Sequence, residues 1–210
     1  MFNLNNINQK YLIGADESGA GCNAGILTVV AVKAPVNWKI SGLNDSKKLS
    51  KNRRATLFEE LSTLTKLAKI AKPHESHFAY SLAISTNDEI DQLGLAACLD
   101  KCYKTAIINL YDQDSYVIWD GNRHIKGIES ICTTNTYTSL IKADSQIPHV
   151  MAASIIAKHY KDTDMAKKHL QYPQYNWINN SGYPTKDHKE AIKSYGYNEF
   201  HRRSYNIKLD

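Results

Sequence analysis

Two short apolar runs near the start of the chain constrain its fold most strongly. Both runs, Tyr11–Ala15 and Ile26–Lys33, have the length of strands, and the second is rich in β-branched side chains. Between them stand the adjacent acids Asp16 and Glu17 and the small-residue segment Gly19–Gly21. Adjacent carboxylates at the end of a strand repel each other, so folding alone gives no reason to place them there. The pair raises the question of what it holds.

Strand-like and helix-like segments alternate along the rest of the chain, which is typical of an α/β protein. Ser50 is suited to cap a helix that carries Leu57 and Leu61 on one face. A helix is also expected from Asn87, with Ile90, Leu93 and Ala97 turned inward. The remaining expected elements are strands at 78–84 and 116–120, a long helix at about 145–169 and a short helix near 187–195. We expect a single domain over residues 1–210, with a helical C-terminal part from about 165 to 210.

The composition narrows the class of protein further. The chain has no 18-residue apolar run, and residues 1–14 show no apolar core of signal-peptide length, so we expect a cytoplasmic protein that makes no membrane contact. A monomer is the default expectation. Its four cysteines form no CxxC pair and are expected to be small buried hydrophobic residues. The net charge of +5 suits a polyanionic partner, although many soluble proteins share it.

Four acids follow strands or precede helices: Asp16, Glu17, Asp120 and Asp144. Any one of them alone is explained by a turn or a helix cap. Together they suggest carboxylates that meet at one edge of a sheet around a cation. Hard divalent metals such as Mg²⁺ take oxygen ligands, and no His/Cys cluster in the sequence offers a zinc site instead.

The glycine-containing segment after the acids fits neither of two common phosphate-binding motifs. A P-loop requires a Lys after its glycines, which is missing here, and the acids stand where a dinucleotide fingerprint would begin its glycines. What remains is a loop whose backbone N–H groups can approach a ligand closely.

Seven blocks of the sequence, in order, match one known pattern. D-E-A-G-R-G-P-x-A-G reads D-E-S-G-A-G-C-N-A-G at 16–25, and D-S-K-K-L-S is intact at 45–50. A D-G pair matches Asp120-Gly121, and K-G-D with A-A-S-I-x-A-K-x-x-R-D matches 142–144 and 152–162, with Lys161 in place of the Arg. N-K-G-Y-G-T-x-x-H and H-R-x-S-F match 180–188 and 201–205. The chain thereby resembles the ribonuclease HII family, the type 2 ribonucleases H.

This resemblance implies a ribonuclease H-like fold: a mixed central sheet flanked by helices, with a small helical C-terminal part. It implies an endonuclease that cuts RNA within RNA–DNA hybrids and ribonucleotides embedded in duplex DNA, leaving 3′-hydroxyl and 5′-phosphate ends. Asp16, Glu17, Asp120 and Asp144 would be the catalytic residues and would coordinate two Mg²⁺ or Mn²⁺ ions.

The resemblance also assigns the nucleic-acid contacts. Backbone groups of Gly19, Ala20 and Gly21, together with Tyr183, would recognise the 2′-hydroxyl at an RNA-to-DNA junction, the group that distinguishes RNA from DNA. The expected phosphate contacts are Lys47, Lys48, Ser154 and Lys158.

The chain departs from the family pattern close to this junction site. Ala20 replaces the Arg of the Gly-Arg-Gly loop, Ser181 replaces a Lys and Pro184 replaces a Gly. Two cations are therefore missing, which predicts a weaker preference for a single embedded ribonucleotide or a steeper loss of activity with salt.

Two other functions stay open at this point. One is a different two-metal nuclease on the same fold that cuts DNA, against which the blocks at 45–50 and 152–158 argue. The other is a protein that binds RNA–DNA hybrids without cutting them, against which the complete set of acids argues.

Overall fold

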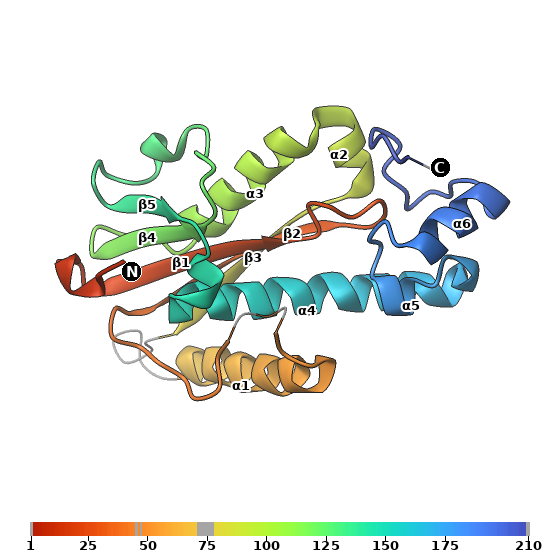
Figure 1. Ribbon diagram of the computed structural model, residues 1–210. Helices are drawn as coiled ribbons and strands as arrows, with labels where there is room; N and C mark the ends of the chain where they lie inside the picture. The colour runs from red at the N-terminus through yellow and green to blue at the C-terminus, as the bar shows by residue number, and fades with distance from the viewer. Residues whose placement is uncertain (1, 45, 47, 71–77, 209–210) are drawn as a thin grey trace.

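The computed structural model describes residues 2–44, 46, 48–70 and 78–208 (Figure 1). It contains a five-stranded mixed sheet in the order β3-β2-β1-β4-β5. The strands are β1 (Tyr11–Ser18), β2 (Leu27–Pro35), β3 (Ala79–Ser85), β4 (Ser115–Asp120) and β5 (Tyr137–Leu140). The β1, β2 and β3 strands pair antiparallel, whereas β4 and β5 run parallel to β1, so the sheet is mixed as expected.

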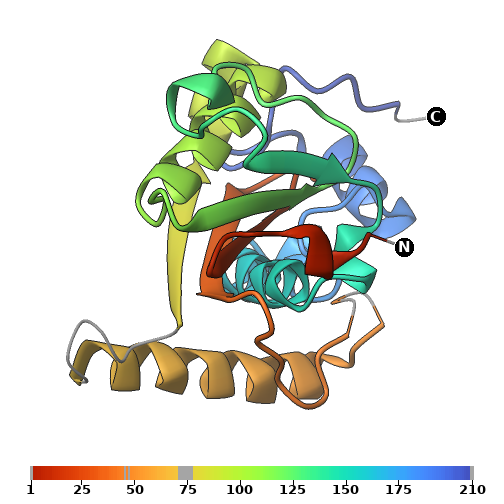
Figure 2. The same ribbon diagram turned by 90° about the vertical axis from the view of Figure 1, so that its left-hand side faces the viewer.

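Helices cover both faces of this sheet, as Figure 2 shows in end view. On one face, α2 (Asn87–Leu93) and α3 (Leu95–Ile108) follow β3; on the other lie α1 (Lys51–Ile70) and α4 (Pro148–Gln171). Short 3₁₀ turns stand at Leu4–Asn6, Ile128–Ser130, Ala143–Ser145 and Pro173–Tyr175. In the part of the chain that the structure describes, no helix is both long enough and apolar enough to cross a membrane.

The pleat of β1 divides its side chains between the two faces. Ile13 packs into the core formed with α3, and Leu12 packs with Val150 of α4. A Cβ on Gly14 would lie 2.5 Å from the backbone of His149 and Val150, so glycine is what lets α4 begin directly against the strand. This contact fixes α4 beside the carboxyl end of β1.

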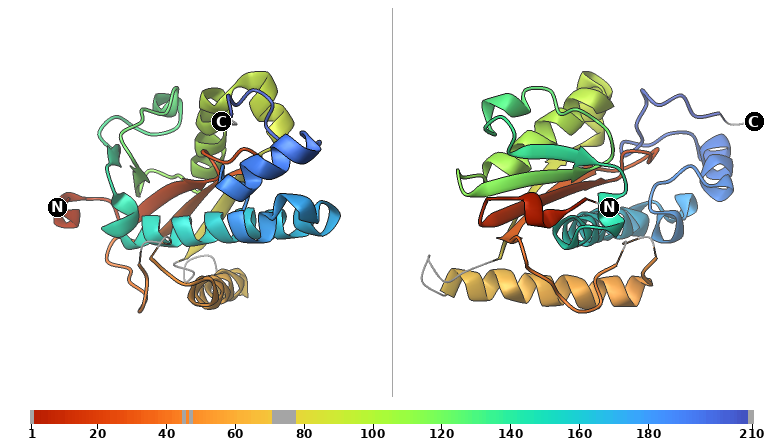
Figure 3. Two further views of the ribbon diagram at one scale, coloured as in Figure 1. Left: turned by 45° about the vertical axis from the view of Figure 1, so that its right-hand side comes forward. Right: turned by 60° about the vertical axis from the view of Figure 1, so that its left-hand side comes forward.

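The C-terminal part packs around the far end of α4 (Figure 3). It contains α5 (Trp177–Asn180) and α6 (Lys186–Tyr195). Its core joins Trp177 and Ile192 to Met165 of α4 and to Ala24 of the loop after β1. Whether the whole chain unfolds as one domain stays a prediction.

Some expectations on single elements need correction. The helix from Asn87 ends at Leu93, because Gly94 takes φ +80° and a second helix starts at Leu95. The break changes the helical phase, so Leu93 is 56% exposed and Ala97 is exposed rather than inward. Ile90, Leu57 and Leu61 are buried as expected, and all four cysteines are buried and unbridged.

Candidate active site

The carboxyl ends of the parallel strands β1 and β4 bring three of the four predicted acids to one cavity. Asp16 and Glu17 end β1, and Asp120 ends β4 beside it. The cavity has a volume of about 170 Å³. It is lined by Asp16, Glu17, Ser18, Gly19, Ala20, Gly21, Ser46, Asp120, Ser154, Lys158 and Tyr183.

Asp144, the fourth acid, lies next to this cavity rather than in its lining. It belongs to the 3₁₀ turn that follows β5, and its side chain is buried. Its backbone N–H approaches Oδ1 of Asp120 at 3.4 Å. The parallel pairing of β5 with β4 thus places Asp144 beside Asp120.

Burial and charge repulsion act together on Asp16. Its pKa is raised well above the usual value, first by burial and then by the nearby charges of Glu17 and Asp120, while a hydrogen bond from Ser154 acts in the opposite direction. Its Oδ1 accepts the backbone N–H of Glu17 at 2.8 Å. A cation beside Asp16 would relieve this repulsion.

Glu17 has a partner that the sequence did not reveal. The buried hydroxyl of Tyr103, on α3, donates to Oε2 of Glu17. The pKa of Tyr103 is raised by its burial and by the charges of Glu17 and Asp16, so this group stays protonated and continues to donate. No motif marks Tyr103 among the 13 tyrosines of the chain.

The donor set of the cavity fits a hard divalent cation in chemistry. Its three acids offer oxygen ligands, as Mg²⁺ and Mn²⁺ prefer, and no His or Cys is among the described residues that line it. Over the described residues, however, no three His, Cys, Asp or Glu side chains are grouped closely enough to hold one ion. Glu17 instead faces Tyr103, so the carboxylates would have to turn toward a cation to ligate it.

The glycine-containing loop is held from behind by Arg202. This side chain is fully buried and donates to the carbonyl oxygens of Gly19 at 2.7 Å, Ala20 at 3.2 Å and Gly25 at 3.0 Å. In a trans peptide the N–H points opposite to the C=O. The N–H groups of Ala20 and Gly21 are therefore directed away from Arg202.

Tyr183 lies opposite this loop, with its ring edge 4.0 Å from where a Cβ on Gly21 would be. Its carbonyl accepts Nδ1–H of His188 at 2.9 Å. Nε2 of His188 in turn accepts the indole N–H of Trp177 at 3.0 Å and lies 3.2 Å from Nε2 of His201. Burial lowers the pKa of His188, and lowers that of His201 to about 4, so this network holds the tyrosine with neutral imidazoles.

The predicted phosphate contacts divide into three cases. Ser154 and Lys158 line the cavity; the Ser154 hydroxyl is 2.9 Å from that of Ser46, and Lys158 pairs with Asp162 at 3.1 Å. Lys48 is exposed and lies outside the cavity lining. Lys47 lies outside the described residues.

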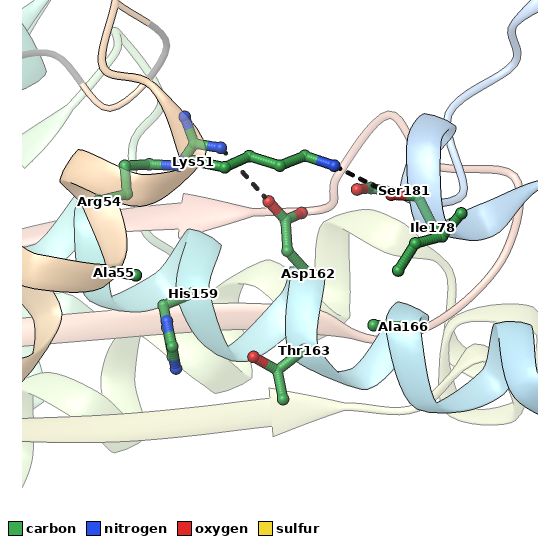
Figure 4. Close-up of a pocket in the computed structure, with 9 residues that line it drawn as sticks. All are labelled: Lys51, Arg54, Ala55, His159, Asp162, Thr163, Ala166, Ile178 and Ser181. Atoms are coloured by element: carbon green, nitrogen blue, oxygen red, sulfur yellow. Dashed lines mark hydrogen bonds and ion pairs between the residues drawn. The ribbon is translucent and has the colours of Figure 1, made fainter.

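A second cavity, of about 200 Å³, lies on the other side of Asp162, between α1, α4 and α5 (Figure 4). Across it Lys51 donates to the carbonyl of Ile178 at 3.0 Å, and Arg54 approaches Asp162 at 3.9 Å. These contacts tie the start of α1 to the C-terminal part of the chain.

Comparison with known proteins assigns the family. The sequence model of Ribonuclease HII matches residues 13–208. Curated proteins named Ribonuclease HII include one from Christiangramia forsetii, 38% identical over 99% of this chain and 96% of its own length, and one from Campylobacter concisus, 39% identical over 94% of each. The fold matches that of RNase HII from Archaeoglobus fulgidus, solved as a PCNA complex, with TM-score 0.72 and 25% identity over 94% of this chain and 96% of that one. With its ribonuclease H-like sheet and full-length sequence match, the chain belongs to the ribonuclease HII family of type 2 ribonucleases H, endonucleases that act on RNA–DNA hybrids.

Proposed function

We propose that this ribonuclease H hydrolyses both the RNA strand of RNA–DNA hybrids and single ribonucleotides embedded in duplex DNA, by a two-metal reaction that leaves 3′-hydroxyl and 5′-phosphate ends. One observation carries the proposal. A single cavity is lined on one side by three acids from two strand ends and on the other by the Gly19–Gly21 loop and Tyr183. Groups for hydrolysis and groups for recognising a ribose thus lie within one substrate's reach.

Asp16, Glu17, Asp120 and Asp144 would hold the divalent cations on which ribonucleases H depend. When bound, such cations lower the pKa of water and neutralise charge on the leaving oxygen in phosphodiester hydrolysis. The chain's own contribution is to hold these carboxylates close together at the edge of the sheet. Tyr103 orients Glu17, and the backbone N–H groups of Glu17 and Asp144 orient Asp16 and Asp120.

The other side of the cavity would bind and align the substrate. The N–H groups of Ala20 and Gly21, directed away from Arg202, are suited to donate to the 2′-hydroxyl, and the Tyr183 ring is suited to pack against the adjoining sugar. Lys158 places a positive charge on the cavity wall for a backbone phosphate, and Ser154 adds a hydroxyl.

The test is gel-mapped cleavage of an end-labelled DNA duplex with one ribonucleotide, beside a long RNA–DNA hybrid, in Mg²⁺ and in Mn²⁺. We expect a cut on the 5′ side of the lone ribonucleotide and cuts throughout the hybrid RNA. If only the hybrid is cleaved, the proposal that the enzyme cuts at embedded ribonucleotides is wrong.

Two controls separate this function from the alternatives. An all-DNA duplex should stay intact, and its cleavage would point to a DNA nuclease on the same fold. Asp120→Asn should abolish cleavage while leaving duplex binding unchanged. Equal activity in Asp120→Asn would contradict the assignment of the acids.

A further inference from the structure

Lys161 is a fully buried lysine on α4, between the glycine-containing loop and Tyr183. Its Cγ and Cδ lie 3.3 and 3.5 Å from the place where a Cβ on Gly19 would be. Its Nζ lies 4.5 Å from the ring centroid of Tyr183, a cation–π distance. One side chain therefore supports both parts of the proposed junction site from below.

The ammonium group of Lys161 is fixed by a full set of acceptors. Nζ is 2.8 Å from the carbonyl oxygen of Ser181, 3.0 Å from Oδ1 of Asp162 and 3.8 Å from Sγ of Cys22. A lysine ammonium has three N–H donors, so every donor has an acceptor. The charge consequently has one defined position beneath the tyrosine ring.

Asp162, the charged partner of Lys161, is itself held from other sides. Lys158 contacts it at 3.1 Å and Arg54 approaches it at 3.9 Å across the cavity of Figure 4. Cations from two helices thus hold this carboxylate in place. Because Asp162 is held in place, it also fixes the position of the Lys161 ammonium group.

We propose that Lys161 is a positioning residue that fixes the spacing between Gly19 and Tyr183, and thereby sets how selectively the site reads a ribonucleotide at an RNA–DNA junction. This inference rests on the proposed function. Because its side chain is fully buried, Lys161 acts through the loop and the ring rather than by touching substrate.

Its neighbours strengthen the case for a role in specificity. Lys161 stands where the family pattern has Arg, and it contacts Cys22 and Ser181, where the pattern has Pro and Lys. Three departures from the pattern are therefore in mutual contact. An ammonium is a compact point charge whereas a guanidinium is a planar fork, so the exchange alters the support beneath the ring.

The test is the substitution Lys161→Met, which removes the charge of the side chain and approximately keeps its volume. Its matched control is Lys168→Met, because Lys168 lies on the same helix, pairs with Asp164 and has its Nζ 4.9 Å from the Phe200 ring, yet contacts neither the loop nor Tyr183. The readout is the ratio of kcat/KM for a single-ribonucleotide duplex to that for a long hybrid, with Tm measured for each variant.

For Lys161→Met we expect this ratio to fall about tenfold, mainly through kcat on the single-ribonucleotide duplex, because misplacing an alignment group affects the transition state more than binding. Lys168→Met should keep the ratio within twofold even where its Tm falls equally. A wild-type ratio in folded Lys161→Met would overturn the proposal.

A double-mutant cycle with Tyr183→Ala tests whether Lys161 acts through the ring. The double variant should show no further loss of the ratio beyond Tyr183→Ala alone, and additive losses would overturn the proposal.

If Lys161→Met does not fold, the same ratio of kcat/KM values is measured for Lys161→Arg. We expect the bulkier guanidinium to change the ratio at least threefold with hybrid cleavage retained, and an unchanged ratio would refute the inference.

Failure of the proposed function gives a different result. If the wild type does not cut the single-ribonucleotide duplex, the proposal on substrate fails, and Lys161 is judged by binding in Ca²⁺. There, wild type should bind the ribonucleotide duplex more tightly than an all-DNA duplex, and Lys161→Met should lose that difference. Equal discrimination by both proteins, or none by the wild type, would overturn the inference.

Discussion

The two sides of the cavity are built in different ways. The acids stand at strand ends that one parallel pairing brings together, and Asp16 and Asp120 each accept a backbone N–H from a neighbouring acid, Glu17 and Asp144 respectively. The loop and Tyr183 are instead braced by buried side chains: Lys161 and Arg202 support the loop, and His188 holds the carbonyl of Tyr183. We infer that the acidic side is strained by its own charge and the recognition side is stabilised by its supports. Substitutions should therefore affect stability in opposite directions on the two sides.

Among the substitutions that test this difference between the two sides, Asp16→Asn is expected to have the largest effect. Cleavage should fall by about a thousandfold or more, because several kcal/mol of charge stabilisation depends on metal ligands of this kind. Since the pKa of Asp16 is raised, its ionised form weakens the fold near neutral pH, and the variant should melt at or above the wild-type temperature in EDTA. A clearly lower Tm would contradict the idea of a strained acidic side.

Arg202→Met should have the opposite signature. The Gly25 carbonyl loses its Arg202 donors, which costs about 1–3 kcal/mol for a buried acceptor left unsatisfied, whereas the carbonyls of Gly19 and Ala20 keep the N–H of Cys22 and the hydroxyl of Tyr205. Urea unfolding should show this loss of stability, together with weaker discrimination of the single ribonucleotide. The neighbouring exposed residue offers a control, since Arg203→Met should change stability by less than about 0.5 kcal/mol. If the two substitutions lower stability equally, the conclusion that Arg202 supports the loop is wrong.

The histidine network behind Tyr183 predicts a pH dependence. Burial lowers the pKa of His201 to about 4, below the usual 6.5 of the unfolded chain, so the unfolded state binds the extra proton between these values. Stability from this group is complete above pH 6.5 and decreases toward pH 4, by about 1.4 kcal/mol per pH unit. Unfolding curves over this range should show a shallower decrease for His201→Asn than for wild type. Parallel curves would show that His201 does not titrate this way.

The smallest effect is expected from Ala20→Arg, which restores a cation that the family pattern has in the loop. An added Arg–phosphate hydrogen bond contributes about 1.5–3 kcal/mol, roughly tenfold or more in affinity for the single-ribonucleotide duplex. The salt dependence of binding should change with the additional phosphate contact. An unchanged junction preference would mean that the backbone donors suffice without the Arg.

The sequence predicted the acidic side well, for a physical reason. Strand ends are readable from β-branched runs, and adjacent acids there have few structural explanations, so the placement of Asp16 and Asp120 at one edge of the sheet followed. The alternation of segments likewise predicted the mixed sheet between helices. Whether residues 1–210 unfold in one transition is open to calorimetry.

The recognition side was harder to predict from the sequence, because the supports of its loop depend on contacts between distant residues. Nothing in the sequence around Lys161 or Tyr103 shows that either side chain supports the site, and only the fold places them behind it. The prediction that Leu93 turns inward was wrong for a local reason. Gly94, with its positive φ, ends the helix and changes the helical phase, which periodicity alone does not detect.

The clasp between Arg202 and Gly19 joins residues 183 positions apart. During synthesis at about 5–20 residues per second, roughly 10–40 s pass between the synthesis of Gly19 and that of Arg202. Until then the nascent chain could present strand ends and acids, but not a braced recognition loop. We infer that the recognition loop gains this clasp only after residue 202 has been made.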